Sequence, residues 1–520
     1  MSEDRPQTIA SGLATVTAGT LFLTVATLVL VVFNFLARVL IVRSISPASW
    51  DAFSLGFTLT QVVLSVGTLG IPVAVARSLP AASSDAERRT IVRTALGVGL
   101  AAAAVSGGAL ALAGPRLGQS LGSPSLGSGL DLFAVALASL ILATILAAVF
   151  QGFANVTPNA LFLQVVSPGL FLAFLAVALV VPPGHVSYLD ALVAYAASCA
   201  ATLGTLVLYT AWRLPRDVPL RGAGEPSARP NLLRLALPLL VFSAMASVVG
   251  SGDTLVLGAV HYAQVGAYSA SLTLARLLQV GVASASYIFL PVASVFVARG
   301  DRRAVGLTYV TVTKWLAVLS LPLFVVFVFL PSASLYFVYG PSYASVVRPL
   351  QIVVAGAFVG ALLGPGAMAQ VAVGQARLLA VNATVAAVVD VGLAVALVPP
   401  YGQVGSAVAW ASANVLYCSL CLVELALAEG YHPFRRHVLV PVAVTCVPVS
   451  GLLFLWHPHV PILVLPAIAV GLAVLFALSI VATGSVDEGD RLLLGALERM
   501  LGRPLPFVRR WAALLRPARP

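Results

Sequence analysis

Five ionisable side chains lie inside long apolar segments and away from the segment ends, where a charge needs a physical reason to be present. They are Arg38, Asp253, Arg276, Lys314 and Asp390. A charged group near the centre of a bilayer costs about 2.5–3.5 kcal/mol on insertion scales. The cations could bind an anion such as a phosphate, because the planar guanidinium group makes bidentate contacts. Arg38 and Lys314 could instead extend along their aliphatic stems to the membrane interface.

The acidic members of this set point to coupling or gating. Asp390 lies in the middle of its segment, where a carboxylate could bind a coupling cation or balance an arginine. Asp253 could pair with Arg38 and lock one state while a substrate phosphate competes for the arginine, and a structural ion pair is the alternative. Asp51 begins the apolar segment 52–76 and is expected to cap the N-terminus of that helix, a structural role.

The composition explains why the surroundings must be lipid. Of the 520 residues, 60% are hydrophobic and only 9% are charged, and the mean hydropathy is +1.02. A soluble domain carries about 25% charged residues, so a soluble enzyme, a disordered chain and a secreted disulfide scaffold are all excluded. The four cysteines lie in apolar segments, and the Cys418–Cys421 pair is expected to serve packing. The sequence predicts an all-α polytopic membrane protein.

Hydrophobic runs separated by Arg, Pro, Gly or Asp predict about 14 transmembrane helices. The expected spans are 16–42, 52–76, 91–114, 130–150, 160–182, 189–212, 232–259, 266–292, 307–330, 347–371, 377–398, 404–427, 437–456 and 461–482. With the N-terminus inside, the inner loops and tails hold 23 of the 29 Lys and Arg residues, and the outer loops hold three: Arg43, Arg116 and Arg348. Because basic loops stay on the cytoplasmic side, both termini are expected in the cytoplasm.

Two polar segments divide this pattern. Residues 213–231 form a Pro-, Gly- and Arg-rich linker between the sixth and seventh spans, so we expect an N-lobe over 1–212 and a C-lobe over 232–428. The last two helices occupy 429–482. Residues 483–520 predict a basic tail, amphipathic from about 486, which places Arg509, Arg510, Arg516 and Arg519 against the anionic inner leaflet. A disordered tail is the alternative.

An internal repeat relates the two lobes. SLGFTLTQVV (54–63) aligns with SASLTLARLL (269–278) at an offset of 215, which also makes Asp253 equivalent to Arg38. VALVVPPGHV (177–186) aligns with VALVPPYGQV (395–404) at an offset of 218, with seven of ten positions identical. Duplication of a six-helix unit is therefore expected, and the two pseudo-symmetric six-helix lobes should have parallel topology. Facing bundles of this kind are typical of alternating-access transporters.

Several motifs, in this order and spacing, are similar to those of one known family. FLARVLIVRSISPASWDAFSLGFTLTQVVLSVGTLGIPVAVAR (35–77) has its first-helix arginine and Pro-containing turn, and GDTLVLGAVHYAQVGAYSASLTLARLL (252–278) is similar to the start of its second lobe. FVYGPSYASVVRPLQI (337–352) and VGQARLLAVNATVAAVVDVGLAVALVPPYGQVGSAVAWASANVL (373–416) look like its turn between spans nine and ten and its eleventh–twelfth span pair. Over roughly residues 10–480 the chain resembles the oligosaccharide/polysaccharide flippases, relatives of the MATE exporters and the peptidoglycan-precursor flippases.

The resemblance implies a flippase that moves a polyprenyl-(pyro)phosphate-linked oligosaccharide from the inner to the outer leaflet by alternating access. It also implies a role in polysaccharide biosynthesis for the cell envelope. Arg38 matches the family's first-helix arginine. Arg38, Arg276 and Lys314 are the expected substrate-binding cations, and Asp253 and Asp390 are the expected coupling or gating groups. The alternative is a MATE-like exporter of small amphipathic compounds coupled to Na⁺ or H⁺.

Other classes of protein find no support in the sequence. It contains no P-loop, nucleophile elbow, HExxH or acidic catalytic cluster, and the outer loops are too short for a glycosyltransferase site. We therefore expect no enzyme activity, cofactor or metal site, and no nucleic-acid partner. The expected partners are the lipid-linked glycan and membrane lipids. Arg outnumbers Lys 28 to 1, which favours the plasma membrane of a GC-rich prokaryote.

Overall fold

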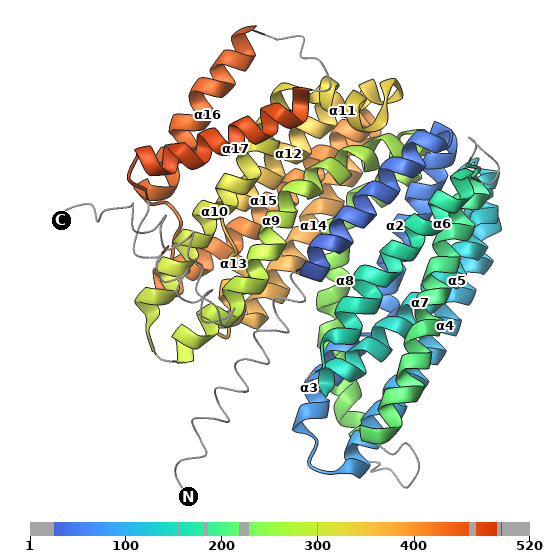
Figure 1. Cartoon of the computed structure of the whole chain (residues 1–520). Helices are drawn as coiled ribbons and strands as arrows, with labels where there is room; N and C mark the ends of the chain where they lie inside the picture. The colour runs from blue at the N-terminus through green and yellow to red at the C-terminus, as the bar shows by residue number, and fades with distance from the viewer. Residues whose placement is uncertain are drawn as a thin grey trace, which may run out of the picture. The chain divides into compact units, whose positions relative to one another are not determined.

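The computed structural model describes residues 25–153, 155–180, 186–217, 228–298, 300–456, 464–485 and 490. Within these residues the chain is helical throughout (Figure 1), which confirms the all-α prediction. The expected amphipathic tail with Arg509, Arg510, Arg516 and Arg519, and most of the 213–231 linker, lie outside the described residues.

Long helices follow one another along the chain. After a first helix over Val25–Ser44, they are α2 (Pro47–Gly67), α3 (Ile71–Ala81), α4 (Asp85–Ser120), α5 (Pro124–Gly152), a π-helical stretch (Asn159–Val166) leading into α6 (Ser167–Val180), α7 (Tyr188–Asp217), α8 (Ala228–Val260), α9 (Val265–Ala298), α10 (Arg302–Phe329), α11 (Pro331–Tyr339), α12 (Val347–Leu362), α13 (Gly366–Ala372), α14 (Ala376–Tyr401), α15 (Gln403–Glu429), α16 (Arg436–Trp456) and α17 (Leu465–Ala482).

Local sequence explains where several of these helices begin. Ser46 precedes Pro47 and accepts a hydrogen bond from the Ser49 N–H, and Ser84 accepts one from the Glu87 N–H at the start of α4. Ser123 and Asp301 cap α5 and α10 in the same way. Side-chain caps of this kind satisfy N–H groups that have no partner inside the helix, so the polar residues between apolar runs set the helix boundaries.

Eleven described helices are long and apolar enough to cross a membrane. They lie at Val25–Ser44, Pro47–Ala81, Asp85–Ser120, Pro124–Gly152, Asn159–Val180, Tyr188–Arg213, Leu239–Val260, Arg302–Phe329, Val347–Ala372, Arg377–Tyr401 and Gln403–Glu429. Two shorter apolar helices, Arg436–Leu452 and Ala467–Ile480, follow them. The chain is thus a multi-pass membrane protein, and the total of 14 spans stays a prediction.

The helices form two compact units, which we describe separately. Unit 2 comprises residues 25–270 and 387–409, and unit 1 comprises the described residues among 271–386 and 410–490. The contact-defined units therefore join α8, and the segments 261–270 and 387–409, to the first six spans. The lobe boundaries expected from the sequence, at the 213–231 linker, stay a prediction.

Unit 2 is organised around α5. This helix packs against α2, α3, α4 and α7, and α8 packs against α2 and α3 (Figure 1). A cluster of aromatic rings fills its interior, with Phe53 5.6 Å from Phe133 and 6.5 Å from Phe171 between ring centroids, and Tyr195 against all three. Aromatic pairs at these distances add stabilisation beyond the area that they bury.

Unit 1 is organised around α10, which packs against α11, α12, α16 and α17. Its core contains Phe289, Tyr309, Leu316, Leu425 and Tyr431, all buried. One transmembrane segment is broken here, because α12 ends at Leu362 and α13 begins at Gly366. Gly364 adopts a φ of +80° in this break, and the Tyr309 hydroxyl donates a hydrogen bond to the Leu363 carbonyl.

The turn between α2 and α3 offers a test of packing in unit 2. Gly70 adopts a φ of +67°, and a Cβ at this position would lie 2.4 Å from the Ala236 carbonyl oxygen in α8. Gly70→Ala should therefore lower the free energy of unfolding by at least about 2 kcal/mol, because strain and a backbone clash add. The matched control is Gly97→Ala in α4, where a Cβ would meet no atom within 4 Å and should be neutral or stabilising. Melting curves of the purified variants would contradict this prediction if the two were equally stable.

Candidate functional site

Asp253 and Asp390, predicted from the sequence as coupling or gating residues, come together inside unit 2. Asp253 lies in α8 and Asp390 in α14, and both are fully buried. The Asp253 backbone N–H donates to Asp390 Oδ2 at 3.2 Å. Gly252 permits this approach, since a Cβ there would lie 2.9 Å from the same oxygen. This contact joins two residues that are 137 positions apart in the sequence.

Further oxygen atoms surround the two carboxyl groups. The Tyr268 hydroxyl donates a short hydrogen bond to Asp253 Oδ2, Thr254 Oγ1 lies 3.4 Å from Asp253 Oδ1, and Ser406 donates to the Asp253 carbonyl at 3.3 Å. Asp390 Oδ1 is buried and has no hydrogen-bond partner in the described structure. Carboxylate, carbonyl and hydroxyl oxygens are the ligands that hard cations prefer, so this oxygen cluster could hold a small cation or a proton.

Asp51 does not cap the start of its own helix, so that prediction was wrong. Ser46 caps α2, while the Asp51 carboxylate accepts the N–H of Gly266, in the first turn of α9, at 2.7 Å. Trp50 Nε1 donates to the Gly266 carbonyl at 2.6 Å. Asp51 and Gly266 are 215 residues apart, which equals the repeat offset. The equivalent helix starts of the two repeats therefore meet each other.

The same end of unit 2 carries more contacts between the repeats. The Ser123 and Tyr262 hydroxyls are 2.9 Å apart, which joins the start of α5 to the turn between α8 and α9. This turn also contacts the α14–α15 turn, where the Gln403 N–H donates to Gln264 Oε1 at 3.1 Å and His261 Nε2 lies 3.2 Å from the Pro399 carbonyl. According to the sequence-based topology all these turns are on the outer side, so we call them the outer-turn cluster.

Arg38, the expected first-helix phosphate ligand, lies half-buried in unit 2. Its guanidinium group lies over the Phe57 ring, 4.9 Å from the ring centroid. A cation over an aromatic face is stabilised electrostatically, so Phe57 orients the arginine within its apolar surroundings. This contact leaves the edge of the planar fork as the part that suits an anion.

The other two expected cations belong to unit 1. Arg276 is half-buried in α9. Lys314 is buried in α10, where its ammonium group donates to Asp490 Oδ2 at 2.5 Å and to the Ser485 carbonyl at 2.9 Å. Trp315 Nε1 donates to Asp490 Oδ1 at 2.8 Å. Lys314 thus holds the segment after α17, a partner that the sequence analysis did not identify because the two residues are 176 positions apart.

Glu424 has amide partners that the sequence did not suggest either. Gln370 and Asn382 both donate to its Oε2 atom, Asn382 at 2.7 Å. In the described residues no group of three or more His, Cys, Asp or Glu side chains comes close enough to hold a metal ion.

The fold is similar to those of several solved transporter structures. The structure is similar to that of the lipid II flippase MurJ in an inward closed conformation (TM-score 0.67, 13% identity, covering 88% of this chain and 98% of that chain). It is also similar to an inward-facing multidrug resistance MATE family transporter (0.62, 15%, 77% and 95%). A third similar structure is a MOP superfamily transporter from Pyrococcus furiosus described as having a binding pocket of reverse polarity (0.53, 14%, 80% and 95%).

The sequence itself places the chain within a particular family. The model of the family "Polysaccharide biosynthesis protein" matches residues 16–297, more than half of the chain. The chain belongs to this family, which confirms the resemblance stated from the motifs. A comparison with curated protein sequences finds no match.

The Lys314–Asp490 pair gives a test of the unit 1 site. Asp490→Asn should destabilise the protein by about 3–5 kcal/mol, because removing one partner leaves a buried charge unpaired. The double variant Lys314→Met/Asp490→Leu should recover much of this loss. Thermal unfolding of the detergent-purified proteins measures both. The pair Arg302–Glu429, 3.3 Å apart and with an arginine side chain that is 75% exposed, is the control, and equal effects at the two pairs would contradict the prediction.

Proposed function

We propose that this protein moves a polyprenyl-(pyro)phosphate-linked oligosaccharide from the inner to the outer leaflet of a prokaryotic plasma membrane. The family, whose name refers to polysaccharide biosynthesis, and the MOP superfamily fold support transport of this kind. The physical problem is that an anionic phosphate and many hydroxyl groups cannot cross hydrocarbon unsatisfied. A path lined by protein cations and hydrogen-bonding groups removes this cost.

The observation that carries the proposal is the meeting of equivalent helix starts at Asp51 and Gly266. A contact at the repeat offset lies close to the pseudo-two-fold axis that relates the repeats, where rocking of one repeat against the other would open or close it. The outer-turn cluster adds hydroxyl, amide and imidazole contacts at the same end. We infer that this cluster is an outer gate, closed in the structure described.

Arg38 and Arg276 are the proposed ligands of the substrate phosphate. Both are half-buried arginines in apolar helices, and the guanidinium fork binds phosphate oxygens in a bidentate manner. Lys314 is held by Asp490 and Ser485, so it would contact substrate only in a state in which Asp490 withdraws. The remaining role that we assign to Lys314 is to fasten the C-terminal segment to α10.

Substitution of the arginines tests the phosphate site. Arg38→Ala and Arg276→Ala should each lower glycan export at least tenfold, because a charge-assisted contact with phosphate is lost. Arg38→Lys should retain only part of the activity, since an ammonium group cannot make the bidentate contact. Export is measured as lectin binding to intact cells of a deletion strain that carries each variant at equal membrane level. Arg43→Ala, at the end of the same helix, serves as the control.

If the Arg38→Ala and Arg276→Ala variants both exported glycan normally, the assignment of these two arginines as ligands of the substrate phosphate would be wrong. Loss of lectin binding for Arg43→Ala as well would indicate a general effect on the helix. Accumulation of intact precursor on the inner face, recovered from spheroplasts, distinguishes a block in flipping from a block in glycan synthesis.

We further propose that the Asp253–Asp390 oxygen cluster binds the coupling cation. Asp253 and Asp390 are both buried, and the contact of the Asp253 backbone N–H with the Asp390 carboxylate brings the two residues together. Two neighbouring buried carboxyl groups favour occupation by Na⁺ or H⁺, which offsets their mutual repulsion. A cation bound there would also stabilise the contact between α8 and α14, and so would change the relative populations of the transport states. A coupling cation is expected for the alternative function as well, a MATE-like exporter, so this site does not distinguish the two functions.

The coupling role predicts dependence on cations. In proteoliposomes, an imposed inward Na⁺ or H⁺ gradient should raise the transport rate of the unmodified protein several-fold. Asp390→Asn should remove this stimulation while leaving the slow rate without a gradient, because the amide no longer carries the charge that attracts the cation. Glu424→Gln, whose carboxylate lies in unit 1, is the matched control. Stimulation that survived in both Asp390→Asn and Asp253→Asn would refute this role.

A further inference from the structure

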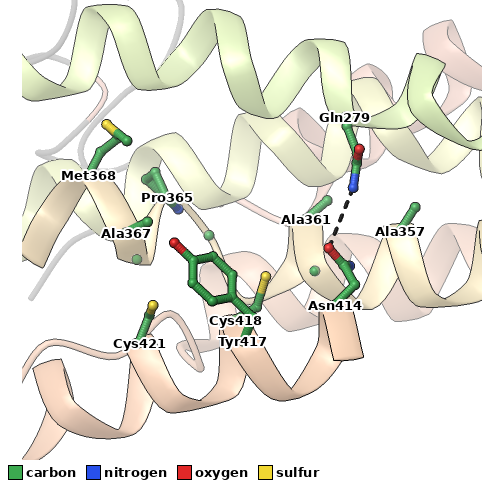
Figure 2. A pocket seen from close by; sticks show the side chains of 13 residues that line it. Gln279, Ala357, Ala361, Pro365, Ala367, Met368, Asn414, Tyr417, Cys418 and Cys421 are labelled. Atoms are coloured by element: carbon green, nitrogen blue, oxygen red, sulfur yellow. Dashed lines mark hydrogen bonds between the residues drawn. The ribbon is translucent and has the colours of Figure 1, made fainter. Parts of the chain in front are cut away.

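A cavity of about 280 Å³ lies inside unit 1, apart from the charged residues considered so far. It is lined by Gln279 of α9, by Ala357, Gly360 and Ala361 of α12, by the break and α13, and by Asn414, Tyr417, Cys418 and Cys421 of α15 (Figure 2). Its volume is near the lower end of the range of about 300–1,000 Å³ for small-molecule sites. Small side chains on α12 make the space, because Gly360 and Ala361 leave room opposite Asn414.

The helix break forms one wall of the cavity. With a rise of about 1.5 Å per residue, the break at Leu363–Pro365 lies about 24 Å along the transmembrane segment from Val347. Non-helical backbone at membrane depth is tolerated only where protein buries it or where it lines an aqueous cavity. Here Gly364, Pro365 and Gly366 line the cavity. Leu363 to Gly366 are buried, and the Leu363 and Gly364 N–H groups and the Leu363 and Pro365 carbonyls are hydrogen-bonded within unit 1, so the protein itself satisfies most of the break.

Two amide side chains give the cavity its hydrogen-bonding character. Gln279 Nε2 donates to Asn414 Oδ1 at 3.5 Å, and Asn414 Nδ2 donates to the Gly356 carbonyl at 3.1 Å (Figure 2). In the described structure the Gln279 amide makes only this one long hydrogen bond, which leaves its carbonyl oxygen available. Tyr417 lies one turn beyond Asn414 on the same helix, and its hydroxyl points toward the Pro365–Ala367 segment (Figure 2).

The internal repeat shows that packing does not require these polar residues. At an offset of 215, Gln279 corresponds to Leu64 in the first repeat (279 − 215 = 64). At an offset of 218, Asn414 and Tyr417 correspond to Ala196 and Cys199 (414 − 218 = 196; 417 − 218 = 199). The same helices of the first repeat thus fold with apolar or small residues. A polar lining that costs free energy in an apolar interior is specific to the second repeat.

We propose that this cavity is a subsite for one neutral sugar ring, an inference that rests on the proposed function and identifies which part of the substrate unit 1 recognises. Amide groups match adjacent sugar hydroxyls as donor and acceptor at once, and an aromatic ring packs against the apolar C–H face of a pyranose. The lining, all of it described, contains no charged side chain, so the ligand is uncharged. The substrate phosphate would bind instead to Arg38 and Arg276.

The cysteines of the lining provide a direct test of occupancy. In lipid nanodiscs, a full-length variant that keeps only Cys418 is treated with N-ethylmaleimide in the presence of glucose, galactose, mannose, rhamnose or N-acetylglucosamine. At least one of these neutral sugars should slow modification of Cys418 threefold or more, and glucuronate should not. A variant that keeps only Cys446, in α16, is the control and should be modified at the same rate throughout. Adding Gln279→Leu or Asn414→Leu to the Cys418 variant should abolish the protection.

Several outcomes would overturn the subsite. Protection by none of the five sugars would show a cavity that holds water only, and equal protection by glucuronate would remove the assigned neutrality. Protection by hexanol and not by sugars would indicate an apolar pocket for a lipid chain. If Cys418 does not react, saturation-transfer NMR of the same sugars against the unmodified and Asn414→Leu proteins decides the question. Flipping that persists without sugar protection refutes the subsite alone, whereas protection without flipping refutes the proposed function alone.

Discussion

The requirement that no charge or peptide group remain unsatisfied in hydrocarbon governs this structure. With 9% of its residues charged, the chain places its few buried ionisable groups in contact with partners that come from distant segments. Asp253 accepts a hydrogen bond from Tyr268, Asp390 accepts one from the Asp253 backbone, and Lys314 donates one to Asp490. Each contact closes a loop between helices, so the polar groups that cost most to bury also fix which helices lie together.

The internal repeat suggests how a contact between equivalent positions could respond to a conformational change. The two six-helix repeats expected from the sequence would have equivalent helix starts, and Asp51 and Gly266, which lie at equivalent positions, are hydrogen-bonded to each other. Contacts on a pseudo-symmetry axis respond most directly when one repeat rocks against the other. Positions away from the axis are free to diverge, as the apolar residues of the first repeat and the polar lining of the unit 1 cavity have done.

Most of the fold could be predicted from the sequence, because apolar runs long enough to span a bilayer leave few alternatives to membrane helices. The repeat and the motifs led to the correct family. Pairing was harder to predict, since composition does not show which distant helices touch. Asp253 contacts Asp390 and Lys314 contacts Asp490, pairings that the sequence did not indicate. The expected pairing of Asp253 with Arg38 stays a prediction. The signal that could have found Asp490 was its position as an acidic residue at the start of a basic tail.

The cavity of unit 1 was beyond sequence analysis for a different reason. Gly356, Gly360 and Gly364 are spaced for close helix approach, and two of them do contact α15 in this way. The cavity also needs the helix break, because α12 ends at Leu362 and α13 begins separately at Gly366. The glycine spacing alone does not predict this break. In the sequence Gln279 and Asn414 are two isolated polar residues in different helices, and only the structure shows that their amide groups are in contact.

Reconstitution with a defined substrate tests the central claim most directly. Proteoliposomes that contain only this chain would be loaded with a fluorescent polyprenyl-diphosphate oligosaccharide, and an impermeant quencher would report the fraction in the outer leaflet. The account predicts movement between leaflets that depends on the protein, saturates with substrate and is lost in Arg38→Ala. No movement of this lipid, together with transport of a small cationic dye by the same vesicles, would contradict the account and establish the exporter instead.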